Sequence, residues 1–469
     1  MNYRIEFDSI GSLQVPRDAY YGVQTLRAKN NFQITNKKMN KELIISLAQI
    51  KKAAAITNRN SGLLNEKISG AIIQACDEVI NGKFHDQFIV DPIQGGAGTS
   101  ANMNANEVIA NRAIEILGSE KGNYNVVHPN DHVNMAQSTN DVFPTAGKIT
   151  ILKLMPKTIS ELKRLYTSLL RKASEFDGII KMGRTQLQDA VPMRLGQSFS
   201  AYAEVVKRDI LRLTKVQDEV RYINMGATAI GTAINASPYY LENIVNELSK
   251  ITDKELYQCP NLIDGTQNLD SFTAVSAVLK TCAVNLSKIC NDLRLLSSGP
   301  RTGINEINLP AKQNGSSIMP GKINPVIPEV VSQVAFNIIG NDFTITMAAE
   351  AGQLELNAFE PVLFYNIFES IETLQGAVKT LTDNCIEGIT ANEEKCRELF
   401  ENSVSLSTAL CPYIGYKKSA EIAKLALKTN RTIKEIILEE KLIDENKLDE
   451  ILDPYKLTGV KETEKTCAI

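Results

Sequence analysis

The spacing of apolar residues between about residues 145 and 385 constrains the fold more than any other feature of the sequence. Apolar side chains recur there every three or four residues, which is the period of an amphipathic helix. The stripes cover residues 159–176, 206–223 and 269–296, and two further segments, 326–339 and 356–381, are apolar on more than one face. The pattern predicts about five helices that are longer than average.

Long helices with wide apolar stripes cannot bury those stripes alone, so we expect a bundle with near-parallel axes. Apolar surface left over after packing within the chain would be buried between subunits, which predicts a homo-oligomer. We therefore expect an all-α fold of three domains. These are a mainly helical N-terminal domain over residues 1–142, a central five-helix bundle over 143–395 and a small helical C-terminal domain over 396–469.

Charge and composition exclude several classes of partner. The chain has 51 Lys and Arg against 54 Asp and Glu, a net charge of −3, and no long basic run. It therefore lacks the electrostatic footprint of a nucleic-acid-binding protein. No stretch approaches the roughly 18 apolar residues of a membrane span. The eight cysteines are scattered without a C-x-x-C motif, which favours reduced thiols and a cytoplasmic protein. A small-molecule substrate is the expected partner.

The first of four polar loops is Gly95–Asn104. Its residues Gly96–Ala101 fit the G-x-G-x-x-A pattern of dinucleotide-binding proteins, which requires a preceding strand in a βαβ unit. The remaining sequence is dominated by helical periods and supplies no such parallel sheet. We therefore favour a substrate-binding loop at a helix start, with Thr99 and Ser100 as hydrogen-bond donors.

The second loop, His128–Asp141, carries two histidines four residues apart. On a regular helix they could seat a metal, but Pro129 argues against such a helix, so we predict no metal site here. Ser138, Thr139 and Asn140 suit a carboxylate and an ammonium group together, and they equally suit a helix cap. Spacing alone leaves that choice open.

The third loop, Gly183–Pro192, lies between two helix stripes and therefore belongs at an end of the bundle. We expect Arg184 and Asp189 to form a structural ion pair with each other.

The fourth loop, Gly315–Pro325, differs from a P-loop, because five residues separate its glycines and Ile323 replaces the Ser or Thr that binds magnesium. Its two hydroxyls, cation and amide are suited to holding an oxyanion. A lysine near a serine also fits an acyl-transfer hydrolase, although no G-x-S-x-G elbow accompanies it.

This fourth loop, Gly-Ser-Ser-Ile-Met-Pro-Gly-Lys-Ile-Asn-Pro, resembles the signature loop of the aspartase/fumarase superfamily, and the other three loops match the remaining active-site segments of that family in order. The likeness runs essentially from end to end. Within the family the pattern is most similar to the aspartases, through the segments Val15–Gly22, Leu293–Arg301, Asn305–Pro310 and Glu350–Leu354.

The resemblance implies reversible deamination of L-aspartate to fumarate and ammonia by a homotetramer with a shared multi-helix core. Each active site would take segments from three subunits. Ser316 would be the base that removes the Cβ proton, which forms an aci-carboxylate intermediate. The β-carboxylate and amino group of the substrate would contact Thr99, Ser138, Thr139 and Asn140. The α-carboxylate would contact Thr185, Lys322 and Asn324, and Gln186 and Ser317 complete the expected binding residues.

One departure from the family pattern bears on the activity. Gln186 stands where fumarases and some aspartases have histidine and other aspartases have glutamine. A histidine proton relay is therefore missing at this position, which favours aspartase over the alternative of a class II fumarate hydratase. The resemblance implies no required cofactor. Activation by a divalent cation at a separate site is known in the family, and we identify no ligands for it in the sequence. A structural protein on a lyase scaffold, like the lens crystallins of this family, is a further alternative.

Overall fold

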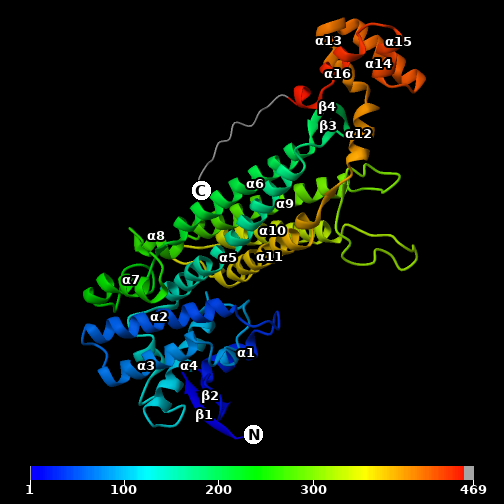
Figure 1. Ribbon diagram of the computed structural model, residues 1–469. Coiled ribbons are helices and arrows are strands. Elements are labelled where there is room, and N and C mark those ends of the chain that lie inside the picture. Colours follow the sequence, from blue (N-terminus) through cyan, green and yellow to red (C-terminus); the bar gives the residue numbers. More distant parts are fainter. Residues whose placement is uncertain (1, 459–469) are drawn as a thin grey trace. The chain divides into compact units, whose positions relative to one another are not determined.

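The structure, a computed structural model that describes residues 2–458, is mainly helical (Figure 1). Five helices of 22 to 37 residues lie in the segments in which the sequence predicts long helices. They are α5 (Thr139–Glu175), α6 (Leu195–Val216), α9 (Asp270–Leu296), α10 (Val326–Glu350) and α11 (Glu360–Asn384). The predicted stripe 206–223 extends beyond its helix, because residues 217–220 form a 3-10 turn and residues 222–223 a short strand. The all-α fold with a core of long helices is therefore confirmed.

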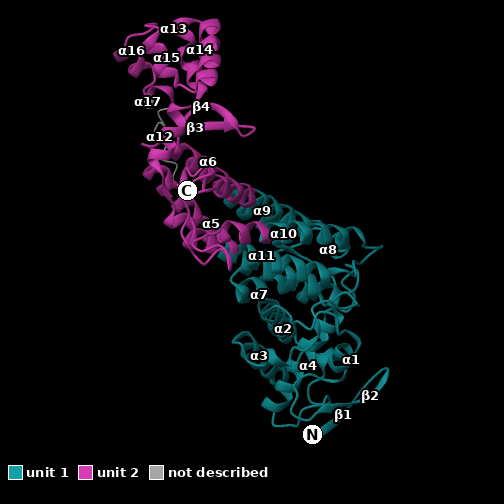
Figure 2. Cartoon of the chain, turned by 90° about the vertical axis from the view of Figure 1, so that its right-hand side faces the viewer, with its two compact units in different colours: residues 1–160, 209–284, 334–376 teal, residues 161–208, 285–333, 377–469 magenta. Residues whose placement is uncertain are grey.

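The chain divides into two compact units, and the long helices pass from one unit into the other (Figure 2). Unit 1 comprises residues 1–160, 209–284 and 334–376. Besides its share of the long helices it holds β1 (Tyr3–Asp8), β2 (Gly11–Pro16), α1 (Val23–Asn31), α2 (Lys41–Asn60), α3 (Glu66–Ile80), α4 (Thr99–Ile116), β5 (Tyr222–Ile223), α7 (Pro238–Thr252), β6 (Tyr257–Gln258) and α8 (Leu262–Gln267).

Aromatic rings join the long helices inside unit 1. The Phe364 ring of α11 lies 5.1 Å from Phe143 of α5 and 5.0 Å from Phe272 of α9, measured between ring centroids. Gly147 permits this approach, because a Cβ at that position would lie 2.2 Å from the Phe364 ring. The Ser276 hydroxyl of α9 also donates to Asp342 of α10 at 2.8 Å. These contacts show the side-by-side helix packing that the apolar stripes predict.

Unit 2 comprises residues 161–208, 285–333 and 377–469. In it the Tyr202 hydroxyl of α6 donates to Asp292 of α9 at 3.0 Å, which joins two of the long helices. The unit also holds β3 (Ile180–Thr185), β4 (Gln188–Arg194), β7 (Ile307–Asn308), β8 (Thr390–Ala391), α12 (Glu393–Glu401), α13 (Ser407–Ile414), α14 (Tyr416–Thr429), α15 (Ile433–Glu439), α16 (Glu445–Ile451) and α17 (Pro454–Leu457). Leu410, Ile436 and Leu448 form a small core for the last helices.

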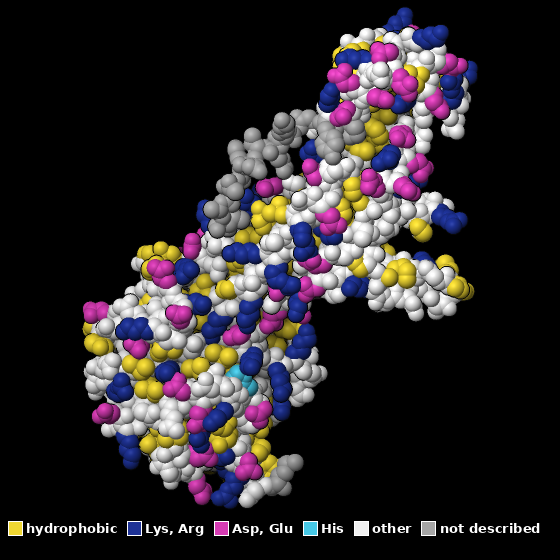
Figure 3. Space-filling view, viewed as in Figure 1, with side chains coloured by type: hydrophobic (Ala, Val, Ile, Leu, Met, Phe, Trp, Pro, Cys, Tyr) yellow, Lys and Arg dark blue, Asp and Glu magenta, His cyan; other side chains and the backbone are white. Residues whose placement is uncertain are grey.

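Within the described residues the strands form four two-stranded sheets, which the helical periods did not predict. Only β5 and β6 pair in parallel, over two residues. Seven cysteines are free thiols, and Cys467 lies outside the described residues. In residues 2–458 no helix is both long and apolar enough to cross a membrane. Acidic and basic side chains are interspersed on the face seen in Figure 3. The boundaries of the three expected domains stay a prediction.

Candidate active site

The predicted Thr99 loop is the N-terminal turn of α4. Gly98 directly precedes the helix at φ +86°, and a Cβ there would lie 2.3 Å from the Phe143 ring, so both conformation and packing require glycine. Thr99 itself is exposed. The described strands place no parallel βαβ unit at this turn, which removes the context that the dinucleotide interpretation of Gly96–Ala101 requires.

The Ser138–Asn140 segment forms the start of α5, close to α4. The Ser138 hydroxyl accepts the Asn140 N–H at 3.2 Å, so Ser138 does act as a helix cap. The Thr139 hydroxyl is buried and accepts from Asn102 Nδ2 at 3.1 Å. Asn140 Nδ2 donates to the Ala229 carbonyl at 2.7 Å. Unit 1 therefore holds these three residues in fixed orientations and ties Thr139 to the helix that Thr99 begins.

A buried lysine that sequence reasoning missed supports this arrangement. Lys51 Nζ donates to Asn134 Oδ1 at 2.7 Å and to Gln137 Oε1 at 2.9 Å. Asn134 Oδ1 also accepts from Asn102 Nδ2 at 3.2 Å, which connects Lys51 with the partner of Thr139. Burial lowers the pKa of Lys51 to about 7. The signal available in the sequence was a lysine within the largely apolar segment Leu47–Ile56.

Asp141 anchors the same segment from the other side. Its carboxylate accepts the backbone N–H of Ser138 at 2.9 Å and those of Gly226 and Thr228 at 3.1 and 3.0 Å. The residue is fully buried, and this desolvation raises the pKa of Asp141 to about 7 against the hydrogen bonds that lower it. Asp141 thus holds the start of α5 against the 226–228 turn.

The Gly315–Pro325 loop, in unit 2, is closed at its base by its own backbone. Gly315 N–H donates to the Lys322 carbonyl at 2.8 Å, and Asn324 Nδ2 donates to the Gly315 carbonyl at 2.7 Å. A Cβ on Gly315 would lie 2.5 Å from that Lys322 oxygen, so the closure requires glycine. The Lys322 and Ser317 side chains are exposed.

Ser316 has the most distinctive surroundings of the predicted site residues. Its Oγ accepts the backbone N–H of Ile318 at 3.1 Å and that of Met319 at 2.9 Å. Hydrogen bonds to the charged form of a group stabilise that form. Two N–H donors on one hydroxyl oxygen are placed to stabilise negative charge on it, which a serine that acts as a base must carry.

A hollow of about 510 Å³ lies beside this loop, within unit 2. Its volume falls in the range of small-molecule sites. Its wall brings Lys322 and Asn324 together with residues of the segments that carry the resemblance, including Arg294, Ser298, Asn305 and Asn308.

Thr185 and Gln186 lie at the tip of the β3–β4 hairpin and are exposed. Gln186 and Leu187 both have left-handed backbone angles, at φ 53° and 64°, as a tight hairpin turn demands. The predicted ion pair between Arg184 and Asp189 is wrong. Arg184 pairs with Glu306, with Nη1 2.8 Å from Oε1, and Asp189 accepts from the Ser403 hydroxyl at 2.7 Å. Both partners are distant in sequence, so local spacing could not indicate them.

The histidine pair takes part in local backbone contacts. His128 Nδ1 accepts the N–H groups of Asn130 and Asp131, both at 3.2 Å, and His132 Nδ1 accepts the His128 N–H at 2.9 Å. Across residues 2–458 no group of three or more His, Cys, Asp or Glu side chains is placed to hold a metal ion.

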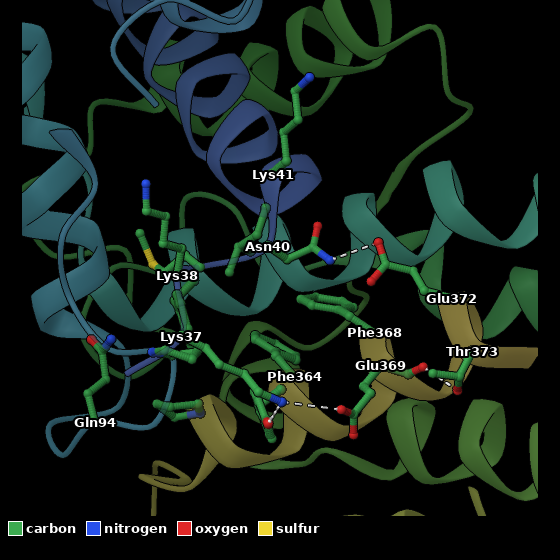
Figure 4. Close-up of a pocket in the computed structure, with 16 residues that line it drawn as sticks. Lys37, Lys38, Asn40, Lys41, Gln94, Phe364, Phe368, Glu369, Glu372 and Thr373 are labelled. Atoms are coloured by element: carbon green, nitrogen blue, oxygen red, sulfur yellow. Dashed lines mark hydrogen bonds and ion pairs between the residues drawn. The ribbon is translucent and has the colours of Figure 1, made fainter. Parts of the chain in front are cut away.

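A second hollow, of about 390 Å³, lies in unit 1 and contains none of the predicted site residues (Figure 4). Phe364 and Phe368 form its aromatic floor. Lys37 reaches across to Glu369, with Nζ 3.5 Å from Oε1, and Asn40 donates to Glu372 at 3.1 Å. Polar groups of this hollow therefore bond to one another.

The fold of long helices and the sequences of the four loops resemble lyases of the aspartase/fumarase type, and comparison with known proteins agrees. Residues 11–340 match a family described as lyase, and residues 406–459 match one described as the fumarase C C-terminus. The chain therefore belongs to the aspartase/fumarase superfamily of lyases.

The relatives place it among the carbon–nitrogen lyases of this superfamily. It is 54% identical to the aspartate ammonia-lyase of Bacillus sp over 97% of both chains, and 55% identical to that of Helicobacter pylori strain 26695 over 97% of both chains. A solved Brucella melitensis structure described as fumarate lyase:delta crystallin bound to cobalt has a TM-score of 0.95 at 51% identity, covering 97% of this chain and 100% of that one. Class II fumarase of Schistosoma mansoni has a TM-score of 0.93 at 36% identity, covering 98% and 99%.

Proposed function

We propose that the chain acts as an aspartate ammonia-lyase in which Ser316 is the base, deaminating L-aspartate reversibly to fumarate and ammonia. The observation that carries the proposal is the pair of N–H donors from Ile318 and Met319 on Ser316 Oγ. A serine alkoxide is a strong base that needs this stabilisation, and fixed donors in a preorganised site supply it without reorganisation during the reaction. The near-full-length likeness to aspartate ammonia-lyases supports the substrate.

The reaction proceeds in two steps. Ser316 Oγ takes the Cβ proton, and the electron pair moves onto the β-carboxylate to form an aci-carboxylate. Donors aimed at that group lower the barrier because its charge grows in the transition state. The electron pair then forms the Cα–Cβ double bond, the C–N bond breaks, and ammonia leaves with the electrons of that bond.

The substrate-binding residues divide according to the two carboxylates. Thr99, Ser138, Thr139 and Asn140 bind the β-carboxylate and amino group, consistent with the fixed orientation of the last three. Thr185, Lys322 and Asn324 bind the α-carboxylate. Gln186 and Ser317 contribute hydrogen bonds at the edge of the site.

We infer that the enzyme is a homotetramer with active sites shared between subunits. Phe336, Phe343 and Met347 of α10 are 64%, 69% and 49% exposed and lie on one helix face. An apolar face of this size on a long helix is suited to burial against another copy. We further propose that the enzyme is cytoplasmic and needs no cofactor. We also propose that a divalent cation activates it, at a site that we do not assign.

Purified protein should be incubated separately with L-aspartate and L-malate, without added cofactor, while fumarate is followed by its ultraviolet absorbance. We expect turnover of aspartate. Turnover of malate alone would identify a fumarase, the candidate that the likeness to the Schistosoma mansoni enzyme favours. Absence of turnover with either substrate would support a structural protein.

A further inference from the structure

A buried carboxylate in unit 2 joins two of the segments that carry predicted substrate-binding residues. The Glu306 side chain is 0% exposed and faces two cations of β3. Arg184 Nη1 donates to Oε1 at 2.8 Å. Lys181 Nζ lies 2.7 Å from Oε2 in an ion pair without good hydrogen-bond geometry. A buried charge of this kind is costly unless it is paired, and removing one partner is strongly destabilising.

The strand is distorted so that both cations reach Glu306. Residues three apart on a regular strand point to opposite faces, yet Lys181 and Arg184 share one partner. The register of the β3–β4 ladder shifts between Met182 and Arg184, and a β-bulge re-aims side chains in this way. Gly183 lies within the bulge, where a Cβ would lie 2.8 Å from the Val191 carbonyl oxygen. The hairpin is therefore shaped to present Arg184 to Glu306.

Glu306 is itself fixed by its backbone. Its N–H donates to the Leu296 carbonyl at the end of α9, and its carbonyl accepts the Asn392 N–H, both at 2.9 Å. Strand β7 follows at once, and the loop with Ser316 and Lys322 begins after it. Asn305 and Ile307, on either side of Glu306, line the hollow that holds Lys322. One immobile carboxylate thus touches the hairpin just before Thr185 and lies at the root of the Ser316 loop.

We propose that Glu306 is a positioning residue that acts through Arg184 to hold Thr185 where it binds the α-carboxylate of the substrate. The Arg184 guanidinium is directly followed in the chain by Thr185, at a hairpin tip that is otherwise exposed. This inference rests on the proposed function, because it assumes that Thr185 binds substrate.

A double-mutant cycle tests the positioning role. Thr185→Val removes a hydrogen bond to a charged group, which should raise KM for aspartate by about tenfold or more. Glu306→Gln keeps the shape and removes the charge, and should raise KM by a similar factor. If Glu306 acts through Thr185, the double variant should resemble the larger single variant. A rise equal to the product of the two single effects, about a hundredfold, would overturn the proposal.

Hydrogen exchange of the hairpin gives a second readout that does not need turnover. Exchange of the amides in residues 183–188, followed by mass spectrometry on the intact protein, should speed up in Glu306→Gln. The matched control is Asp177→Asn, which removes the ion pair of Arg194 at the base of the same hairpin and should leave both KM and tip exchange unchanged. Unchanged tip exchange in a folded Glu306→Gln protein would also refute the anchoring role.

Arg184→Lys replaces Glu306→Gln if the latter fails to fold. It keeps the charge but loses the planar fork that reaches Glu306, and the same non-additivity with Thr185→Val and the same faster exchange are expected. Wild-type protein that does not convert aspartate would refute the proposed function, while the exchange measurement would still decide whether Glu306 anchors the hairpin.

Discussion

Replacement of Ser316 by alanine gives the sharpest test of the proposed chemistry. In the structure its Oγ accepts two backbone N–H groups, at 2.9 and 3.1 Å. A hydrogen bond to a charged group contributes about 1.5–3 kcal/mol, so two such bonds stabilise the alkoxide by roughly 3–6 kcal/mol. The alanine variant loses this base entirely.

Steady-state kinetics with aspartate, followed at the fumarate absorbance, should show kcat lowered by about 10²–10⁴-fold in Ser316→Ala, as is typical for loss of a general base. KM should change comparatively little, because the hydroxyl acts in the transition state rather than in ground-state binding.

Ser317→Ala tests which serine is the base, since the proposed role of this exposed hydroxyl is substrate binding alone and the N–H groups of Ile318 and Met319 donate to Ser316 instead. A Ser317→Ala variant without activity beside a nearly wild-type Ser316→Ala, both folded and assembled, would refute the assignment of the base.

Three further predictions follow from other parts of the site. Lys322→Ala should raise KM for aspartate strongly, since it removes the cation proposed to bind the α-carboxylate, and an unchanged KM would contradict that role. Burial raises the pKa of Asp141 to about 7 in the folded protein, against 3.8 for an exposed aspartate. Its stabilising contribution, up to about 4 kcal/mol, is complete below pH 3.8 and lost as pH rises through 7. The Tm of Asp141→Asn should therefore decrease less between pH 4 and 7 than the Tm of the wild type. An equal decrease in both proteins would contradict a protonated Asp141 in the folded state. Phe343→Asp on the exposed face of α10 should dissociate the oligomer, as measured by size-exclusion chromatography. The dissociated protein should keep its helices but lose its activity, and an active monomer would contradict shared sites.

The long helices could be predicted because burial of an apolar stripe imposes a period of three to four residues on the sequence. The N-terminal turn at Gly98 and the loop closed by Gly315 could be located for a related reason, since glycines and polar residues interrupt that period. Two-residue strands such as β7 leave no such trace. They are too short to show alternation, and their pairing depends on partners far along the chain.

The buried partners that hold the site residues in place could not be predicted from the sequence, for a different reason. Arg184 was assigned to Asp189 because the two are close in sequence, while its real partner Glu306 is 122 residues away. Lys51 similarly bonds to Asn134 over 83 residues. A buried charged residue needs a partner, and the sequence can predict that need. The identity of the partner depends on the tertiary structure.

The two missed residues explain how a site made of short hydroxyl and amide side chains can be kept rigid. Thr139 and Thr185 have little reach of their own, so their hydroxyl positions depend on backbone placement to within a fraction of an ångström. Each is connected to a buried ionisable group. Thr139 is connected to Lys51 through Asn102, and Thr185 follows Arg184, which donates to Glu306. Apolar residues of similar size would often stabilise the fold as well or better. We therefore expect Lys51→Met to lower kcat for aspartate while leaving Tm nearly unchanged. A variant with a lowered Tm and an unchanged kcat would show that Lys51 serves the fold alone.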